Sequence, residues 1–123
     1  MDRKTLEART KVFAHNCVKT ALSLEGTKLG NHICGQLIRC ATSVPANYRA
    51  ANLAHSRAAF AAKLSIVIEE ADECGFWLDF AIGENILSTA VAEPLIKEAH
   101  ELTSIFVASR KSIQVKSKII NQK

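Results

Sequence analysis

Apolar residues along the chain recur at steps of three and four, as on one face of an α-helix, and no strand-length run alternates apolar with polar residues. Four amphipathic segments can be traced, over residues 3–24, 31–52, 56–82 and 90–114. The breaks between them are short, and short loops between long helices make consecutive helices antiparallel. The pattern therefore predicts an all-α fold, an antiparallel up-down-up-down four-helix bundle over residues 1–116, followed by a basic, frayed tail over residues 117–123.

The second segment contains a proline in its interior. Pro45 removes one intrahelical hydrogen bond, and its ring clashes with the preceding turn, at a cost of about 3 kcal/mol. The helical spacing nevertheless continues from Ile33 to Ala51. We infer that packing on both sides holds this segment. We predict a kink near Pro45 that brings Asn47 and Arg49 to the third helix or to a neighbouring subunit.

The third segment is apolar around most of its circumference. Its seven-residue seam runs from Phe60 to Ala81. Further large apolar side chains lie off that seam: Ile66, Ile68, Phe76, Trp77, Phe80 and Ile82. A four-helix core with wide stripes is one explanation, and a second face buried against another subunit is the other. We favour the second explanation, so the sequence predicts a homo-oligomer.

Composition indicates a single helical domain. The 123 residues are 48% hydrophobic and 6% aromatic, with five glycines and two prolines, which favours helices over a sheet with many turns. The four cysteines (Cys17, Cys34, Cys40 and Cys74) form no Cys-x-x-Cys pair. No apolar run approaches the ~20 residues of a membrane span. We therefore expect a cytoplasmic protein with free, mostly buried thiols and no membrane segment.

Signatures of catalysis are missing from the sequence. It has no Gly-x-Ser-x-Gly elbow, no Cys-His signature and no glycine-rich phosphate loop. Four carboxylates crowd about one helical turn between Glu69 and Glu73, but a di-metal bundle site needs Glu-x-x-His repeats, and no acid has a histidine three residues after it. We therefore expect no enzymatic activity, no metal and no cofactor.

The acidic run has two further interpretations. Consecutive acids usually form a solvated face. Alternatively, one or two of them reach inward to Arg39, Arg49 or Lys63, because a buried or interfacial arginine needs a carboxylate fork. The candidate polar residues that link helices or subunits are Asn47, Glu70 and Glu73.

Positive charge is the remaining functional signal. The net charge is +4, and the residues after 109 include five basic side chains and no acid. Such charges bind phosphate with little sequence readout, although a solvated, frayed helix end has the same composition. The candidate nucleic-acid-binding residues are Arg39, Arg49, Arg57, Lys63, Arg110 and Lys111. Two functions stay open: binding of RNA, DNA or a ribonucleoprotein through a basic surface, and a protein–protein interaction scaffold without nucleic-acid contact.

An ordered set of short motifs between about residues 13 and 112 resembles a known family. The motifs are Gln36-Leu37-x-Arg39, Thr42-Ser43-Val44-x-Ala46-Asn47-Tyr48-Arg49-Ala50-Ala51, Ser56-x-x-x-Phe60-x-x-Lys63-Leu64, Glu70-Ala71-Asp72-Glu73 with Trp77-Leu78, and Glu98-Ala99-x-Glu101-Leu102 with Ile105. The set is similar to the small four-helix-bundle proteins encoded by intervening sequences in bacterial 23S ribosomal RNA genes. Relatives of that family include the accessory variability determinant of diversity-generating retroelements.

This resemblance implies a homopentamer. In the retroelement relatives, it implies a basic surface or channel that engages nucleic acid and a reverse transcriptase. Matched residue by residue, it marks six positions as constrained by either binding or folding: Arg39, Asn47, Arg49, Lys63, Glu70 and Glu73.

Overall fold

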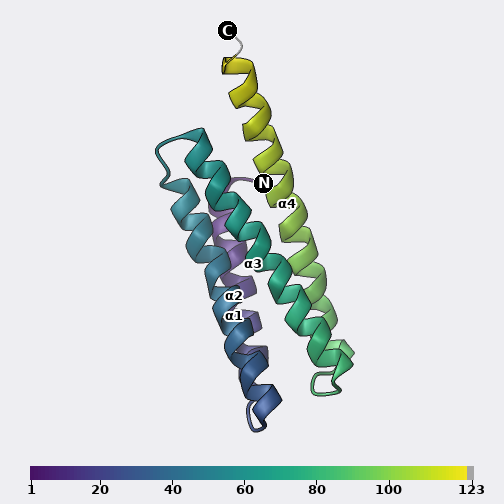
Figure 1. Cartoon of the computed structure of the whole chain (residues 1–123). Helices are drawn as coiled ribbons and strands as arrows, with labels where there is room; N and C mark the ends of the chain where they lie inside the picture. The colour runs from purple at the N-terminus through teal and green to yellow at the C-terminus, as the bar shows by residue number, and fades with distance from the viewer. Residues whose placement is uncertain (122–123) are drawn as a thin grey trace.

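A computed structural model describes residues 1–121 and shows four α-helices joined by short connections (Figure 1). The helices are α1 (Arg3–Leu22), α2 (Lys28–Asn52), α3 (Arg57–Gly83) and α4 (Thr89–Asn121). Consecutive helices are antiparallel and pack against each other, whereas α4 contacts α1 only sparsely. The described part of the chain contains no strand. The predicted all-α four-helix bundle is therefore confirmed.

The core lies along the bundle axis and takes side chains from all four helices. Phe13, Leu37, Leu64 and Phe106, one from each helix, are fully buried. Burying a side chain of this size contributes about 1.5–3 kcal/mol relative to leaving it exposed. The ring centroid of Tyr48 lies 4.9 Å from that of Phe106, which joins α2 to α4 across the core. The apolar faces predicted from the sequence are the faces that meet there.

The second helix begins at Lys28, before the predicted start at residue 31. The hydroxyl of Thr27 accepts a hydrogen bond from the backbone N–H of Gly30 at 3.0 Å and so caps the first turn. Gly30 is buried, and a Cβ atom at this position would clash with the carbonyl oxygen of Leu24. The glycine therefore allows the α1–α2 connection to approach closely, and it lies inside the helix rather than in the break before residue 31.

The fourth helix is longer than predicted and continues to Asn121 instead of ending at residue 114. Residues 117–121, predicted as a frayed tail, are helical, because no glycine or proline follows Pro94 in this helix. Arg110 also donates a hydrogen bond to the hydroxyl of Ser65 on α3 at 3.3 Å, and this contact holds the later turns near the bundle. Gln122 and Lys123, at the end of the predicted tail, lie outside the described residues.

The helix α2 continues without interruption through Pro45. Val44 and Tyr48, on either side of the proline, are both buried in the core. Packing on both sides thus offsets the lost hydrogen bond, as the sequence pattern indicated. The kink that we expected at this proline stays a prediction.

Candidate nucleic-acid interface

The charged residues are separated along the bundle axis. The antiparallel topology brings residues 1–11, 45–63 and 106–118 to the end of the bundle that carries the N-terminus and the α2–α3 connection (Figure 1). This basic end has eleven lysines and arginines and two acids: Arg3, Lys4, Arg9, Lys11, Arg49, Arg57, Lys63, Arg110, Lys111, Lys116 and Lys118, with Asp2 and Glu7. The rest of the described chain has ten acids and four basic residues: Glu25, Glu69, Glu70, Asp72, Glu73, Asp79, Glu84, Glu93, Glu98 and Glu101, with Lys19, Lys28, Arg39 and Lys97.

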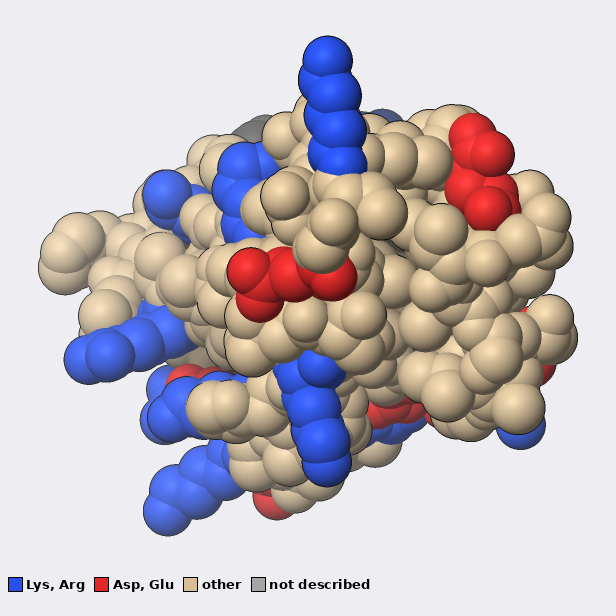
Figure 2. Space-filling model, turned by 90° about the horizontal axis from the view of Figure 1, so that it is seen from below, with Lys and Arg blue, Asp and Glu red and all other residues tan. Residues whose placement is uncertain are grey.

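The separation has a simple signature in the sequence, because no acid occurs between residues 26 and 68 or after Glu101. Figure 2 views the molecule from below, so that the end opposite the basic end faces the reader, and shows Lys and Arg side chains at the left and centre of this view and few at its right. Charges of one sign that gather on one part of a protein create a potential that attracts counter-charged ligands. The net charge of +4 thus understates the field at the basic end.

Two surface clefts lie within the basic end. The first, of about 260 Å³ between α1 and α2, is lined by Arg3, Lys11 and Arg49. Its one acid, Glu7, accepts a hydrogen bond from the side-chain amide of Asn52 at 2.9 Å. A cleft that presents three cations and one hydrogen-bonded carboxylate favours an anion such as phosphate.

The second cleft, of about 620 Å³, lies between the start of α3 and the end of α4 and is lined by Arg57 and Lys118. Arg110 stands beside it through its hydrogen bond to Ser65, which also lines the cleft. Arg49, Arg57 and Lys111 are exposed, whereas Lys63 is half-buried on α3. Five of the six predicted nucleic-acid-binding residues therefore lie at one end of the bundle.

Arg39, the sixth candidate, lies in the acidic part of the bundle and pairs with acids of α3. Its guanidinium donates to Glu70 at 3.1 Å and also to Glu73. The hydrogen bond to Glu73, followed by the charges of both acids, raises the pKa of Arg39. Glu73 also accepts a hydrogen bond from the indole N–H of Trp77 at 3.1 Å. Arg39 therefore links α2 to α3, and the acids around it make it a poor phosphate ligand.

The predicted contact of Asn47 with the third helix or a neighbouring subunit stays a prediction, and the hydrogen bonds of its side chain in this structure lie within α2. Its side-chain amide donates to the carbonyl oxygen of Ser43 at 2.9 Å and to the Ser43 hydroxyl at 2.8 Å, within α2 itself. The two residues are four positions apart and therefore lie on the same face of the helix. Local hydrogen bonds of this kind compete with contacts to another helix.

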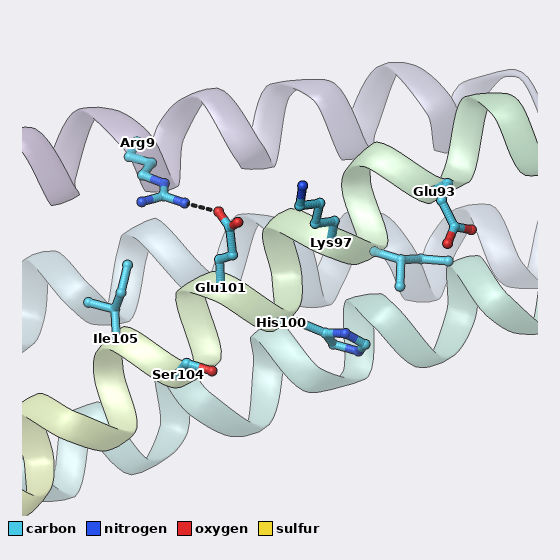
Figure 3. Close-up of a pocket in the computed structure, with 8 residues that line it drawn as sticks. Arg9, Glu93, Lys97, His100, Glu101, Ser104 and Ile105 are labelled. Carbon is cyan, nitrogen blue, oxygen red and sulfur yellow. Dashed lines mark hydrogen bonds and ion pairs between the residues drawn. The ribbon is translucent and has the colours of Figure 1, made fainter.

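The sequence prediction missed a second arginine fork, which joins α1 to α4. Arg9 Nη2 lies 2.6 Å from Glu98 Oε1 and 2.7 Å from Glu101 Oε2, and Arg9 Nε donates to Glu98 Oε2 at 2.7 Å. These bonds, above all those to Glu98, raise the pKa of Arg9. Figure 3 shows Arg9 reaching from α1 to Glu101 on α4. The three-residue spacing of Glu98 and Glu101 was the available signal, because it places both acids on one helix face.

The fork borders a surface pocket of about 670 Å³, which Lys97 and His100 also line. His100 lies over α3, since a Cβ atom at Gly75 would be 4.0 Å from its Nε2 (Figure 3). Arg9 is held by two carboxylates, and the pocket brings no nucleophile and base into hydrogen-bond contact. The ion pairs that join α1 to α4 therefore account for the charged residues of this pocket, and we assign it no catalytic role.

The cysteines form part of the core. Cys17, Cys40 and Cys74 are fully buried, and the Sγ atoms of Cys40 and Cys74 are 3.2 Å apart. The hydrogen bonds that Cys74 makes with these thiols, together with burial, raise its pKa, so it stays a neutral thiol at physiological pH. Within residues 1–121, no group of three or more His, Cys, Asp or Glu side chains is placed to hold a metal ion. None of the described helices has the length and apolar character needed to cross a bilayer.

The fold and the charge pattern define a small antiparallel four-helix-bundle protein whose polar features lie on its surface, with one basic end. The chain belongs to the family of 23S rRNA-intervening sequence proteins, whose family model matches residues 8–108. The resemblance of its motifs to that family is thereby confirmed, and the connection to retroelement relatives stays a prediction.

A solved structure supports the same fold. It is a protein of unknown function from the S23 ribosomal protein family of Bacteroides thetaiotaomicron, with a TM-score of 0.79 and 26% sequence identity. The match covers 90% of this chain and 99% of that one. No curated protein sequence matches the chain.

Proposed function

We propose that this protein binds nucleic acid, non-catalytically, through the basic end of the bundle. The observation that carries the proposal is the separation of charge, with eleven basic residues and two acids at one end, where only Arg9 is paired with acids of the other part, Glu98 and Glu101. Phosphate contacts of lysine and arginine release counterions, which gives affinity that falls with salt and depends little on sequence. Membership in a family named after an intervening sequence in 23S rRNA is consistent with an RNA ligand.

Arg49 and Arg57 are the residues on which the proposal depends most. Both are exposed and each lines one of the two clefts of the basic end. Among the described residues, ion pairs involve only Arg9 and Arg39. The charges of Arg49 and Arg57 are therefore available to phosphate, and we place the first contacts there.

A salt series with labelled, structured RNA and with duplex DNA tests the proposal. We expect the double substitution R49Q/R57Q to weaken binding and to reduce the slope of log K against log salt by about 2 between about 50 and 200 mM salt. The matched control K19Q/K28Q removes the same charge from two exposed residues of the acidic part. No binding at low salt, or equal losses in both variants, would contradict a site at the basic end.

A protein-interaction scaffold is the second candidate, and the exposed Phe76 and Phe80 on α3 favour it. On this candidate the protein assembles with itself, as a pentamer by resemblance, or with a reverse transcriptase, and it makes no contact with nucleic acid. The salt series separates the two, because a scaffold without a nucleic-acid site leaves both probes unbound at low salt.

A further inference from the structure

The outer face of α3 is apolar where a soluble helix is normally polar. Ile66, Phe76 and Phe80 are 36%, 54% and 39% exposed. The ring of Phe76 lies 4.9 Å from that of Trp77 and 5.9 Å from that of Phe80, so the aromatic residues form one continuous patch. A helix that is apolar on its outer side as well as its inner side is typical of a helix with two packed faces.

The charges on this part of α3 are negative. Glu69, Asp72 and Asp79 are exposed on or beside the apolar patch, and the nearby Arg39 is paired with Glu70 and Glu73. We call this surface the α3 stripe: Ile66, Glu69, Asp72, Phe76, Asp79 and Phe80. A partner that buries it must be apolar and must supply positive charge.

The outer face of α4 has that composition. Val107, Val115 and Ile119 are 38%, 49% and 50% exposed, and Lys111 and Lys118 are exposed among them. We call this surface the α4 stripe: Val107, Lys111, Val115, Lys118 and Ile119. Steps of three, four and seven place these residues on one side of the helix, away from Phe106, which is buried in the core. Lys118, at the edge of this surface, also lines the cleft between α3 and α4.

We propose that the α4 stripe of one copy of this chain docks on the α3 stripe of a second copy. The two stripes face outward from different helices of one bundle, so one chain cannot bring its own stripes together. Lys111 and Lys118 are separated by seven residues, as are Asp72 and Asp79, and seven helical residues span about 10.5 Å. The charged pairs therefore match in spacing as well as in sign.

This interface joins two different surfaces, so two docked copies each keep one unused stripe, and further copies add there until the assembly closes as a ring or grows as a filament. The proposal names the surfaces for the self-association described in the second candidate function, and it does not depend on nucleic-acid binding. Arg49 and Arg57 lie outside both stripes, so the variant that tests nucleic-acid binding leaves the docking surfaces intact.

Sedimentation of nucleic-acid-free protein over a range of concentrations tests the docking. We expect the wild type to self-associate. The substitutions F76S/F80S should weaken the association by about tenfold or more, because exposed aromatic residues of this kind are typical interface anchors. The matched control V12S/L22S changes two exposed apolar residues on α1 and should have no effect.

Charge reversal then tests the pairing of the two stripes. K111E/K118E and D72K/D79K should each weaken self-association by about tenfold, and the quadruple variant that combines them should restore it. Circular dichroism confirms that each variant is folded, and mixing the two double variants gives a second route to restored association. A monomeric wild type, or a quadruple variant that associates no better than the double variants, overturns the proposal.

Discussion

Replacing Arg9 with methionine tests whether one arginine fork holds the sparse contact between α1 and α4. Arg9 makes three hydrogen bonds of 2.6–2.7 Å to Glu98 and Glu101. The side chains of Arg9 and Glu98 are 23% and 26% exposed, so water screens their charges only in part. Methionine keeps most of the aliphatic stem of the arginine side chain. The decrease in the free energy of unfolding therefore reports on the charge and its hydrogen bonds rather than on packing.

The expected loss lies between two limits. Exposed ion pairs contribute about 0.2–1 kcal/mol, and a buried hydrogen bond to a charged group contributes about 1.5–3 kcal/mol. For a half-screened fork with three bonds we expect R9M to lower the free energy of unfolding by about 1.5 kcal/mol, and the melting temperature by about 5 °C. Arg39 is the control, because it also contacts two acids but is 50% exposed. We expect R39M to cost about 0.5 kcal/mol.

Urea unfolding followed by circular dichroism measures both variants under the same conditions. The result that refutes the reasoning is a loss in R39M equal to or greater than that in R9M, because burial would then not decide the strength of the fork. An R9M protein as stable as the wild type would show that apolar packing alone holds α1 against α4.

Three further substitutions test the local structure by thermal unfolding. G30A should lower stability by about 1–3 kcal/mol, because its Cβ atom meets the carbonyl of Leu24. G35A should raise stability by about 0.5–1 kcal/mol, since no atom lies within 4 Å of a Cβ at this exposed helical position; equal effects in the two variants would contradict this account. Asp2 accepts a hydrogen bond from the backbone N–H of Thr5 at 2.8 Å, which lowers its pKa below 3.8. A carboxylate whose pKa is lowered by folding stabilises the fold at pH values above its pKa in the unfolded chain, and this contribution is lost as the pH falls. The destabilisation caused by D2A should therefore disappear as the pH falls below about 4. A difference in stability that does not change with pH would exclude the carboxylate as its source.

Helix positions could be predicted from the sequence because the apolar spacing reports directly on the buried faces. The first and last residues of each helix were harder to predict, since they depend on contacts between distant residues. Gly30 looks like a helix breaker until the carbonyl of Leu24 is seen beside it. Arg110 of α4 also contacts Ser65 of α3, and a contact between positions 45 residues apart cannot be read from the sequence.

The site was predicted only in part, because a sequence shows charges but not which of them meet. Arg39 and Arg49 look alike as basic residues of one amphipathic segment. Only the antiparallel pairing places Arg39 beside the acids of α3 and Arg49 at the opposite, basic end. The absence of acids between residues 26 and 68 was visible in the sequence, but its meaning depends on which helix ends lie together.

The two proposals share Lys111 and Lys118 and otherwise depend on different residues. Ten cations at the basic end, leaving out Arg9 with its partners Glu98 and Glu101, repel one another, and this repulsion destabilises the fold unless a counter-charge is supplied. In the proposed assembly the acids of a neighbouring α3 stripe neutralise Lys111 and Lys118, whereas Arg3, Lys11, Arg49 and Arg57 lie on other helices. Self-association should therefore lower the repulsion without covering the cleft between α1 and α2. The charge on that cleft is then repeated in every copy, and this repetition raises the affinity of the assembly for a polyanion above that of one chain.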